Sequence, residues 1–153
     1  MSISMDVIER EIFLKAPRSR VWKAISSAEE FGQWFGMKLD GESFEPGKTI
    51  KAPLTIKNYD HLVLEMVIDR IESEDLFSYR WHPYAVDISY DYSVEPMTLV
   101  TFELTDADGG TLLKVTESGF EALPPERLAD AFRMNSSGWE GQLKNIEKHV
   151  SEA

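Results

Sequence analysis

A long amphipathic pattern occupies the end of the chain. From residue 125 onward, apolar residues recur at steps of three, four or seven, which aligns them on one face of a helix. They are Leu128, Phe132, Trp139, Leu143, Ile146 and Val150. The adjacent Pro124 and Pro125 suit a helix start, because the first turn tolerates a residue without an N–H. The pattern predicts one helix from about Pro125 to Val150, roughly 40 Å long, whose apolar side must cover another layer of structure.

Alternation typical of strands covers most of the remaining sequence. Residues Val7–Leu14 alternate, and helical spacing follows at 17–26 and 28–35. After residue 37, alternating segments separated by turn residues predict six further strands. Their ranges are Lys38–Phe44, Thr49–Lys57, Leu62–Ile71, Leu76–His82, Thr98–Thr105 and Thr111–Phe120. This order predicts an α+β fold in which a seven-stranded antiparallel sheet is covered on one face by the final helix.

One predicted connection is too long for a simple turn. Residues Pro83–Pro96 join two strands through 14 residues that include Tyr84, Tyr90 and Tyr92 among acidic residues. Connections of this length are usually functional or mobile. The segment is therefore a candidate contact for a protein partner.

Composition narrows the classes of function. A chain of 153 residues is expected to form a single domain, 1–153, with its own core. The absence of cysteine removes thiolate chemistry, and no residues have the spacing of a zinc site, so no metal or cofactor is expected. A net charge of -11 opposes binding to nucleic acid and to anionic membranes. Without a signal-peptide pattern or a long apolar run, the expected location is the cytoplasm.

Several short motifs together resemble a known family. They are Ala16-Pro17 with Val21-Trp22, Phe31 with Trp34-Phe35, Trp81-His82-Pro83, Leu99–Phe102, Thr116–Phe120, and Gly138-Trp139 with Leu143 and Ile146. The combination is similar to the Hsp90 ATPase activator homologue 1-like family of the START/Bet v 1-like (SRPBCC) helix-grip superfamily. The resemblance implies a seven-stranded sheet that grips the last helix, two short helices after the first strand, and a hydrophobic cavity between sheet and helix. It implies no particular ligand, because this scaffold serves lipid carriers, polyketide cyclases and co-chaperone domains.

Aromatic and thioether side chains are more numerous than a filled core of this size needs. Such side chains suit an adaptable pocket wall, although they are equally typical of a packed core. The candidate ligand-binding residues are Trp34, Phe35, Tyr59, Met66, Tyr79, Trp81, His82, Phe102, Glu117, Phe132, Asn135 and Trp139. Within the last helix, the small and polar residues Asn135–Gly138 replace a bulky turn, which leaves space, introduces a kink or allows a close approach.

Charged residues interrupt two of the apolar strand faces. In this superfamily the strands of Arg10 and Glu117 lie side by side, so a buried ion pair between them is the favoured structural interpretation. The functional alternative is that one of them anchors a polar group of a ligand. His82 is interpreted as structural, since no nucleophile or carboxylate partner is identifiable beside it. His149 is expected to be solvated.

Three functions follow from these observations. The leading one is a binding protein for a small hydrophobic ligand, aromatic or lipid-like, oriented by Tyr79, His82 or Glu117. The second is an enzyme of the polyketide cyclase or aromatase type, in which only His82, Glu117 and the tyrosines could move a proton. The third is a co-chaperone-like module that binds a protein through Pro83–Pro96.

Overall fold

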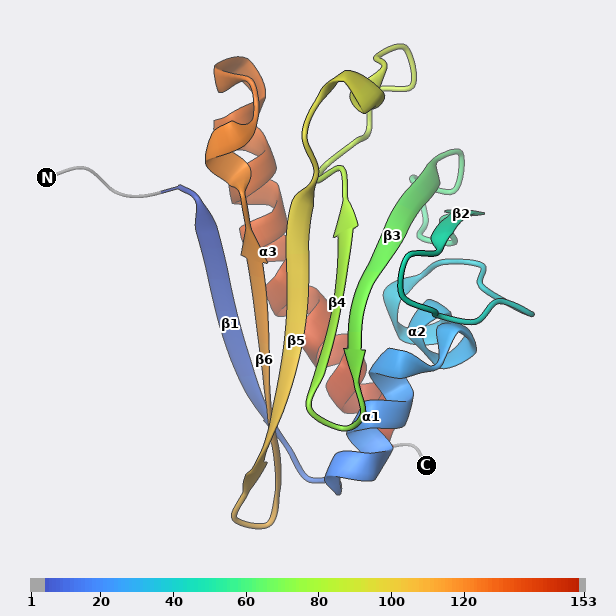
Figure 1. The fold of residues 1–153 in the computed structure, drawn as a ribbon, viewed down its shortest axis with the longest axis vertical. Coiled ribbons are helices and arrows are strands. Elements are labelled where there is room, and N and C mark those ends of the chain that lie inside the picture. The colour runs from blue at the N-terminus through green and yellow to red at the C-terminus, as the bar shows by residue number, and fades with distance from the viewer. Residues whose placement is uncertain (1–4, 152–153) are drawn as a thin grey trace, which may run out of the picture.

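A computed structural model describes residues 5–151 (Figure 1). The ends of the predicted domain, residues 1–4 and 152–153, lie outside the described residues. The elements are β1 (Val7–Leu14), α1 (Arg18–Ser26), α2 (Ala28–Phe35), β2 (Thr49–Pro53), β3 (Val63–Glu72), β4 (Leu76–Trp81), η1 (Tyr92–Val94), β5 (Thr98–Ala107), β6 (Gly110–Ser118), η2 (Phe120–Ala122) and α3 (Pro125–Ser151). The order of strand, two short helices, strands and long helix is the predicted one.

The strands form one antiparallel sheet in the order β1-β6-β5-β4-β3-β2. Figure 1 shows α3 crossing one face of this sheet, with α1 and α2 at one end of the same side. Helix α3 contacts β1, α1 and α2, so the sheet and the short helices enclose its buried side. The predicted α+β helix-grip architecture is thereby confirmed.

The sheet has six strands, so the predicted seventh is wrong. Residues 38–44 form no strand, and the segment pairs with the sheet only through a bridge between Met37 and Leu54. Gly41, with φ of 79°, lies in a turn closed by the bond from Glu42 N to Leu39 O. Leu39 and Phe44 are both buried, although an odd separation would put them on opposite faces of a strand. The turn resolves this conflict by directing both side chains into the core.

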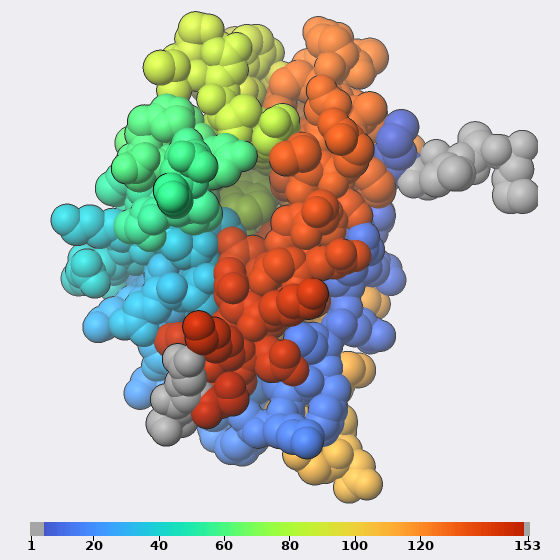
Figure 2. Space-filling view, turned by 180° about the vertical axis from the view of Figure 1, so that it is seen from behind, coloured from blue at the N-terminus to red at the C-terminus, as the bar shows by residue number. Residues whose placement is uncertain are grey.

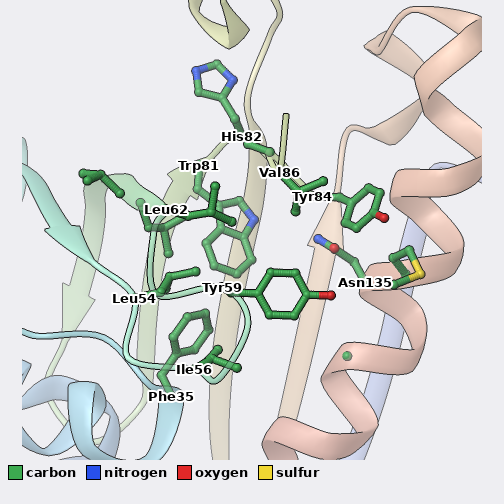
Figure 3. A pocket seen from close by; sticks show the side chains of 15 residues that line it. Phe35, Leu54, Ile56, Tyr59, Leu62, Trp81, His82, Tyr84, Val86 and Asn135 are labelled. Carbon is green, nitrogen blue, oxygen red and sulfur yellow. The ribbon is translucent and has the colours of Figure 1, made fainter. Parts of the chain in front are cut away.

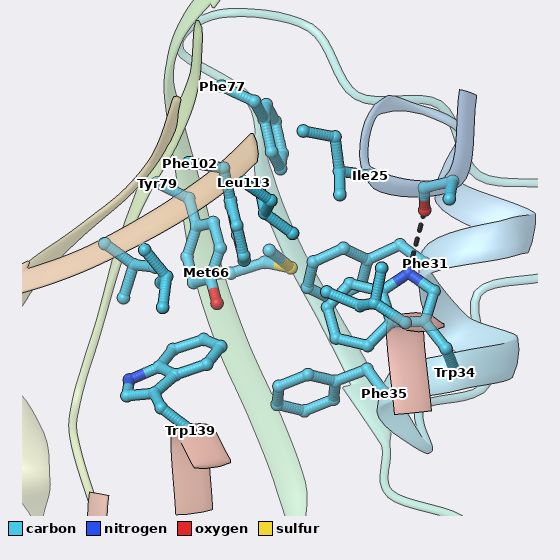
Figure 4. Close-up of a cluster of buried hydrophobic side chains, with 14 of the residues drawn as sticks. Ile25, Phe31, Trp34, Phe35, Met66, Phe77, Tyr79, Phe102, Leu113 and Trp139 are labelled. Atoms are coloured by element: carbon cyan, nitrogen blue, oxygen red, sulfur yellow. Dashed lines mark hydrogen bonds between the residues drawn. The ribbon is translucent and has the colours of Figure 1, made fainter. Parts of the chain in front are cut away.

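The core lies between the sheet and the helices and is rich in aromatic rings (Figure 4). Phe31 of α2 packs edge-on against Phe77 and Tyr79 of β4, with ring centroids 6.4 and 5.9 Å apart. Phe102 of β5 lies parallel to Phe77 at 6.3 Å. Trp34 fixes α2 against α1, because its Nε1 donates to the carbonyl of Ala24 at 2.8 Å. Edge-to-face and offset contacts of this kind are the favoured aromatic geometries.

Helix α3 follows its predicted pattern over Pro125–Ser151. Trp139 and the three apolar residues after it are buried, while Leu128 and Phe132 are partly buried against the core. Near the end of α3, the prediction that His149 is solvated is wrong. Its Nε2 lies 2.8 Å from Oε1 of Glu30, which also accepts from Arg20, so the imidazole ties α3 to the two short helices. No helix within residues 5–151 is long and apolar enough to cross a bilayer.

Candidate functional site

A pocket of about 250 Å³ opens beside α3 where the sheet is no longer covered by packed side chains. In Figure 2 it is the hollow between the green 54–63 segment, the yellow-green 83–96 loop and the orange part of α3. Its walls are mostly apolar and include Phe35, Leu54, Ile56, Leu62, Trp81 and Val86. Tyr59 extends across the pocket toward α3 (Figure 3). The pocket therefore combines strands β3 and β4, helices α2 and α3, and two irregular connections.

A second chamber of about 160 Å³ continues from the first toward the body of α3. The two share Phe35, Trp81, Asn135 and Gly138, and Trp139 belongs to the second. The helix residues lie three or four positions apart, which places them on neighbouring turns of one face.

Gly138 leaves this part of the pocket open. A β-carbon added at Gly138 would meet no atom within 4 Å, and α3 continues unbroken through the position. Of the three expectations for Asn135–Gly138, the structure therefore favours open space over a close approach.

Glu117 of β6 lies beneath the pocket wall and accepts hydrogen bonds from four side chains. It is fully buried. Its Oε1 accepts from Nδ2 of Asn135 at 2.9 Å and from Nε1 of Trp139 at 2.8 Å. Its Oε2 accepts from Nε1 of Trp81 at 2.8 Å and from Oγ1 of Thr98 at 2.6 Å. We call these five residues the Glu117 cluster, in which one carboxylate joins β4, β5, β6 and α3.

The predicted ion pair between Arg10 and Glu117 is wrong. Glu117 stands opposite Ile8 in the β1–β6 register, and Arg10 extends instead to α3, where its Nε lies 3.5 Å from Oε1 of Glu140 and it donates to Ser136. Within residues 5–151, Glu117 forms no ion pair. Neutral donors stabilise its charge in place of a cation, which is an alternative way to satisfy a buried carboxylate.

The hydroxyl of Tyr79 is buried near this cluster without a hydrogen-bond partner in the described chain. It points toward Trp139 in Figure 4. Burial above all, and then the charge of Glu117, raises the pKa of Tyr79 well above its ordinary value of 10.0. The side chain is therefore a neutral phenol in the folded protein.

His82 follows β4 at the edge of the pocket. Its Nδ1 is buried and has no hydrogen-bond partner within residues 5–151. Burial lowers the pKa of His82 below 6.5, and the charge of Arg127 adds to this, while Glu65 and Glu95 act in the opposite direction. The imidazole is consequently neutral at pH 7.

Arg127 at the start of α3 clamps the 83–96 loop. It donates to the carbonyls of Pro83 and Tyr84 at 3.0 Å, and its Nη2 lies 2.8 Å from Oε1 of Glu95. Its guanidinium also lies 4.7 Å from the ring centroid of Tyr92. Because Tyr84 lines the pocket, this clamp holds one pocket wall in place. Sequence reasoning missed it, since nothing in the local pattern links Glu95 to a residue more than 30 positions away.

Acid is expected to release this clamp only below about pH 4.5. Burial by itself raises the pKa of Glu95, but hydrogen bonds from Arg127 and Tyr90 and the charge of Arg127 hold it below 4.5. A carboxyl with a lowered pKa stabilises the fold fully above its unfolded value, and the contribution is lost as pH falls through the folded value. The NMR shift of the Glu95 side-chain carboxyl carbon should therefore stay constant from about pH 7 to about pH 5 and then move. An acid opening of the loop that persists unchanged in Glu95→Gln, or a transition above pH 5 that this variant abolishes, would contradict this assignment.

The structure brings together about half of the candidate residues. Phe35, Tyr59, Trp81, His82 and Asn135 line the first chamber, and Trp139 lines the second, with Glu117 behind them. Trp34, Met66, Tyr79 and Phe102 lie in the packed core. Phe132 packs against Phe120, with ring centroids 5.3 Å apart, outside both chambers. Most of the rest of the wall belongs to the connections at 54–62 and 84–86, whose irregular backbone has no sequence periodicity to identify inward positions.

The sequence matches the Activator of Hsp90 ATPase homolog 1-like protein family over residues 15–151. The chain belongs to this family. The match includes every helix and strand except β1, and it confirms the family that the sequence motifs resemble. A search of curated proteins found no match.

Solved structures share the fold at low sequence identity. Protein MLL2253 from Mesorhizobium loti is 20% identical with a TM-score of 0.72, and the match covers 96% of this chain and 98% of that one. A protein from Arthrobacter aurescens is 13% identical with a TM-score of 0.76, covering 99% and 91%. DynU16, from the dynemicin biosynthetic locus, is 20% identical with a TM-score of 0.70 over 95% of this chain. The chain spans about half of the length of DynU16, 47%. Likeness at this level concerns the fold.

Proposed function

We propose that the protein binds a small, largely apolar aromatic molecule in the pocket beside α3. The observation that carries the proposal is an open, ring-lined pocket next to a core that is already filled by its own side chains. Phe35, Trp81 and Tyr84 offer ring faces, and Leu54 and Val86 offer aliphatic surface. Pockets that bind small molecules have this composition, with few polar groups among apolar walls.

The size of the pocket favours a compact ligand over a long lipid chain. Its two chambers measure about 250 and 160 Å³, whereas sites for drug-sized molecules run from about 300 to 1,000 Å³. The walls include the aromatic rings of Phe35, Trp81 and Tyr84, which flat aromatic molecules complement better than branched ones.

An enzyme of the cyclase type is the second candidate function. The specific observation in its favour is His82, a neutral imidazole at the pocket edge that is able to accept a proton. DynU16, whose fold is similar, belongs to a biosynthetic locus. The oxygens of Glu117 already accept hydrogen bonds from the cluster, so no proton transfer is assigned to Glu117.

Filling the pocket at Gly138 tests the binding function. We expect Gly138→Leu to abolish ligand binding without lowering stability, because its side chain enters open space and glycine is a poor helix former. The readout is the melting temperature with compact aromatic compounds; at 100 times its dissociation constant a ligand contributes about 2.7 kcal/mol, or roughly 5 °C or more.

Gly141→Leu is the matched control. Gly141 also lies in α3 with open space around it, yet it lines neither chamber, so this variant should keep the ligand-induced shift. Equal shifts in both variants would place binding elsewhere. If no compact aromatic compound shifts the wild type, the binding proposal fails, and the exposed Ile88 and Val94 of the 83–96 loop would then favour a protein partner.

A further inference from the structure

We infer that the pocket selects an uncharged aromatic ligand that carries a hydrogen-bond donor, such as a phenolic hydroxyl, and that Oδ1 of Asn135 accepts this hydrogen bond. The inference rests on the proposed function and names the chemical class of its ligand. It follows from the way in which the Glu117 cluster uses the polar atoms behind the pocket wall.

The orientation of the Asn135 amide is fixed by its neighbour. The carboxylate of Glu117 only accepts hydrogen bonds, and an asparagine amide offers its donors on one side and its acceptor on the other. The nitrogen of Asn135 lies 2.9 and 3.2 Å from the two oxygens of Glu117, so it is the nitrogen that faces inward. Oδ1 therefore faces away from Glu117. Asn135 lines both chambers, and no described residue donates to its oxygen.

The other donors of this wall are already used. The indole N–H groups of Trp81 and Trp139 both point at Glu117, which leaves only their ring surfaces for a ligand. Nε2 of Gln142, at the end of the second chamber, donates to the carbonyl of Phe35 at 3.0 Å. The fixed polar atom that this wall offers is thus an acceptor.

Charge excludes an anionic ligand. The described residues that line the two chambers include no lysine or arginine, and the carboxylate of Glu117 lies directly behind Asn135. A ligand carboxylate would lose its hydration without a cation to replace it, and it would be repelled by Glu117. Free fatty acids and aromatic acids are therefore poor ligands for this pocket.

The remaining polar groups do not change this selection. Tyr59 and Tyr84 line the pocket through hydroxyls that rotate and can either donate or accept. The imidazole of His82 lies at the edge of the pocket, and its Nδ1 is buried. Selection between donor and acceptor ligands is accordingly assigned to Asn135.

Matched compounds test the inference on the unmodified protein. We would measure dissociation constants calorimetrically for 2-naphthol, 2-methoxynaphthalene and 2-naphthoate, and for the pair 4-phenylphenol and 4-methoxybiphenyl. Each hydroxyl compound should bind about tenfold more tightly than its methyl ether, because the ether leaves Oδ1 without a donor. The naphthoate should bind at least tenfold more weakly than the naphthol.

The variant Asn135→Leu removes the acceptor. It should bind hydroxyl and methoxy compounds with equal affinity, a ratio that a loss of stability alone would not change. The Gly138→Leu variant serves as the blocked-pocket reference. Should Asn135→Leu fail to fold, the wild-type ratios still decide the matter.

The outcomes separate this inference from the proposed function. Equal wild-type affinities within both matched pairs, with binding lost in Gly138→Leu, would overturn the role of Asn135 and leave the binding function intact. Tighter binding of the naphthoate would overturn the charge argument. No saturable binding of any of the five compounds would overturn both proposals together.

Discussion

Replacing Glu117 by alanine should lower the free energy of unfolding by about 4 kcal/mol, because each buried donor left without a partner costs about 1–3 kcal/mol. The substitution deprives four donors of their acceptor, and two of these are the indoles of Trp81 and Trp139, which are 7% and 2% exposed. The total is smaller than the sum of the four donor costs, because the substitution also removes a carboxylate whose burial was itself unfavourable. Urea denaturation followed by tryptophan fluorescence measures the change.

The near-isosteric variant Glu117→Gln keeps the side-chain volume, so it measures how much stability is lost through the charge and the acceptor oxygens alone. A glutamine keeps one oxygen but turns an amide nitrogen toward donors that need an acceptor, so we expect a loss of about 2 kcal/mol. Glu103 is exposed on the neighbouring strand β5, and Glu103→Ala should change the stability by less than about 0.5 kcal/mol. A Glu117→Ala variant as stable as the Glu103→Ala control would show that the cluster does not support the fold.

Arg127→Met should cost about 3 kcal/mol, because it leaves the buried carboxylate of Glu95 without its cation. The side chain of Glu95 is 1% exposed in the pair with Arg127, and the same guanidinium holds the carbonyls of Pro83 and Tyr84. The 83–96 loop should then open locally, so limited proteolysis is expected to cut within it before the rest of the chain unfolds.

Arg133 provides the control for this experiment. It lies on the same helix with a side chain that is 74% exposed, and its pair with Asp130 is on the surface. Exposed ion pairs contribute about 0–1 kcal/mol, so Arg133→Met should leave both stability and cleavage nearly unchanged. If Arg127→Met behaves like Arg133→Met, the clamp is not what holds the loop.

Regular elements were the part of the fold that the sequence could predict. The spacing of apolar residues in α3 and the alternation in β1 and β3–β6 follow directly from helix and strand geometry. The segment at 38–44 was wrongly predicted as a strand. Its apolar residues are buried by a turn at Gly41, and the hydrophobic pattern alone does not distinguish such a turn from a strand.

The site was less predictable because its contacts join distant parts of the chain. The sequence correctly singled out Glu117 as a charge on an apolar strand, but the predicted partner, Arg10, does not contact it and pairs with Glu140 instead. Four neutral donors from three other elements converge on it, and no sequence spacing encodes such a convergence. The same reasoning explains why the clamp between Arg127 and Glu95 had no local signal.

The division between a filled interior and a pocket rim of irregular connections has an evolutionary consequence. Ile56, Tyr59 and Val86 contact the hollow from segments that contribute nothing to the sheet ladder. Mutations there can drift without weakening the hydrogen bonds between strands, whereas those at Phe31 or Phe77 disturb the packed rings. Lineages that inherit this scaffold can therefore diversify what they hold while keeping the same architecture.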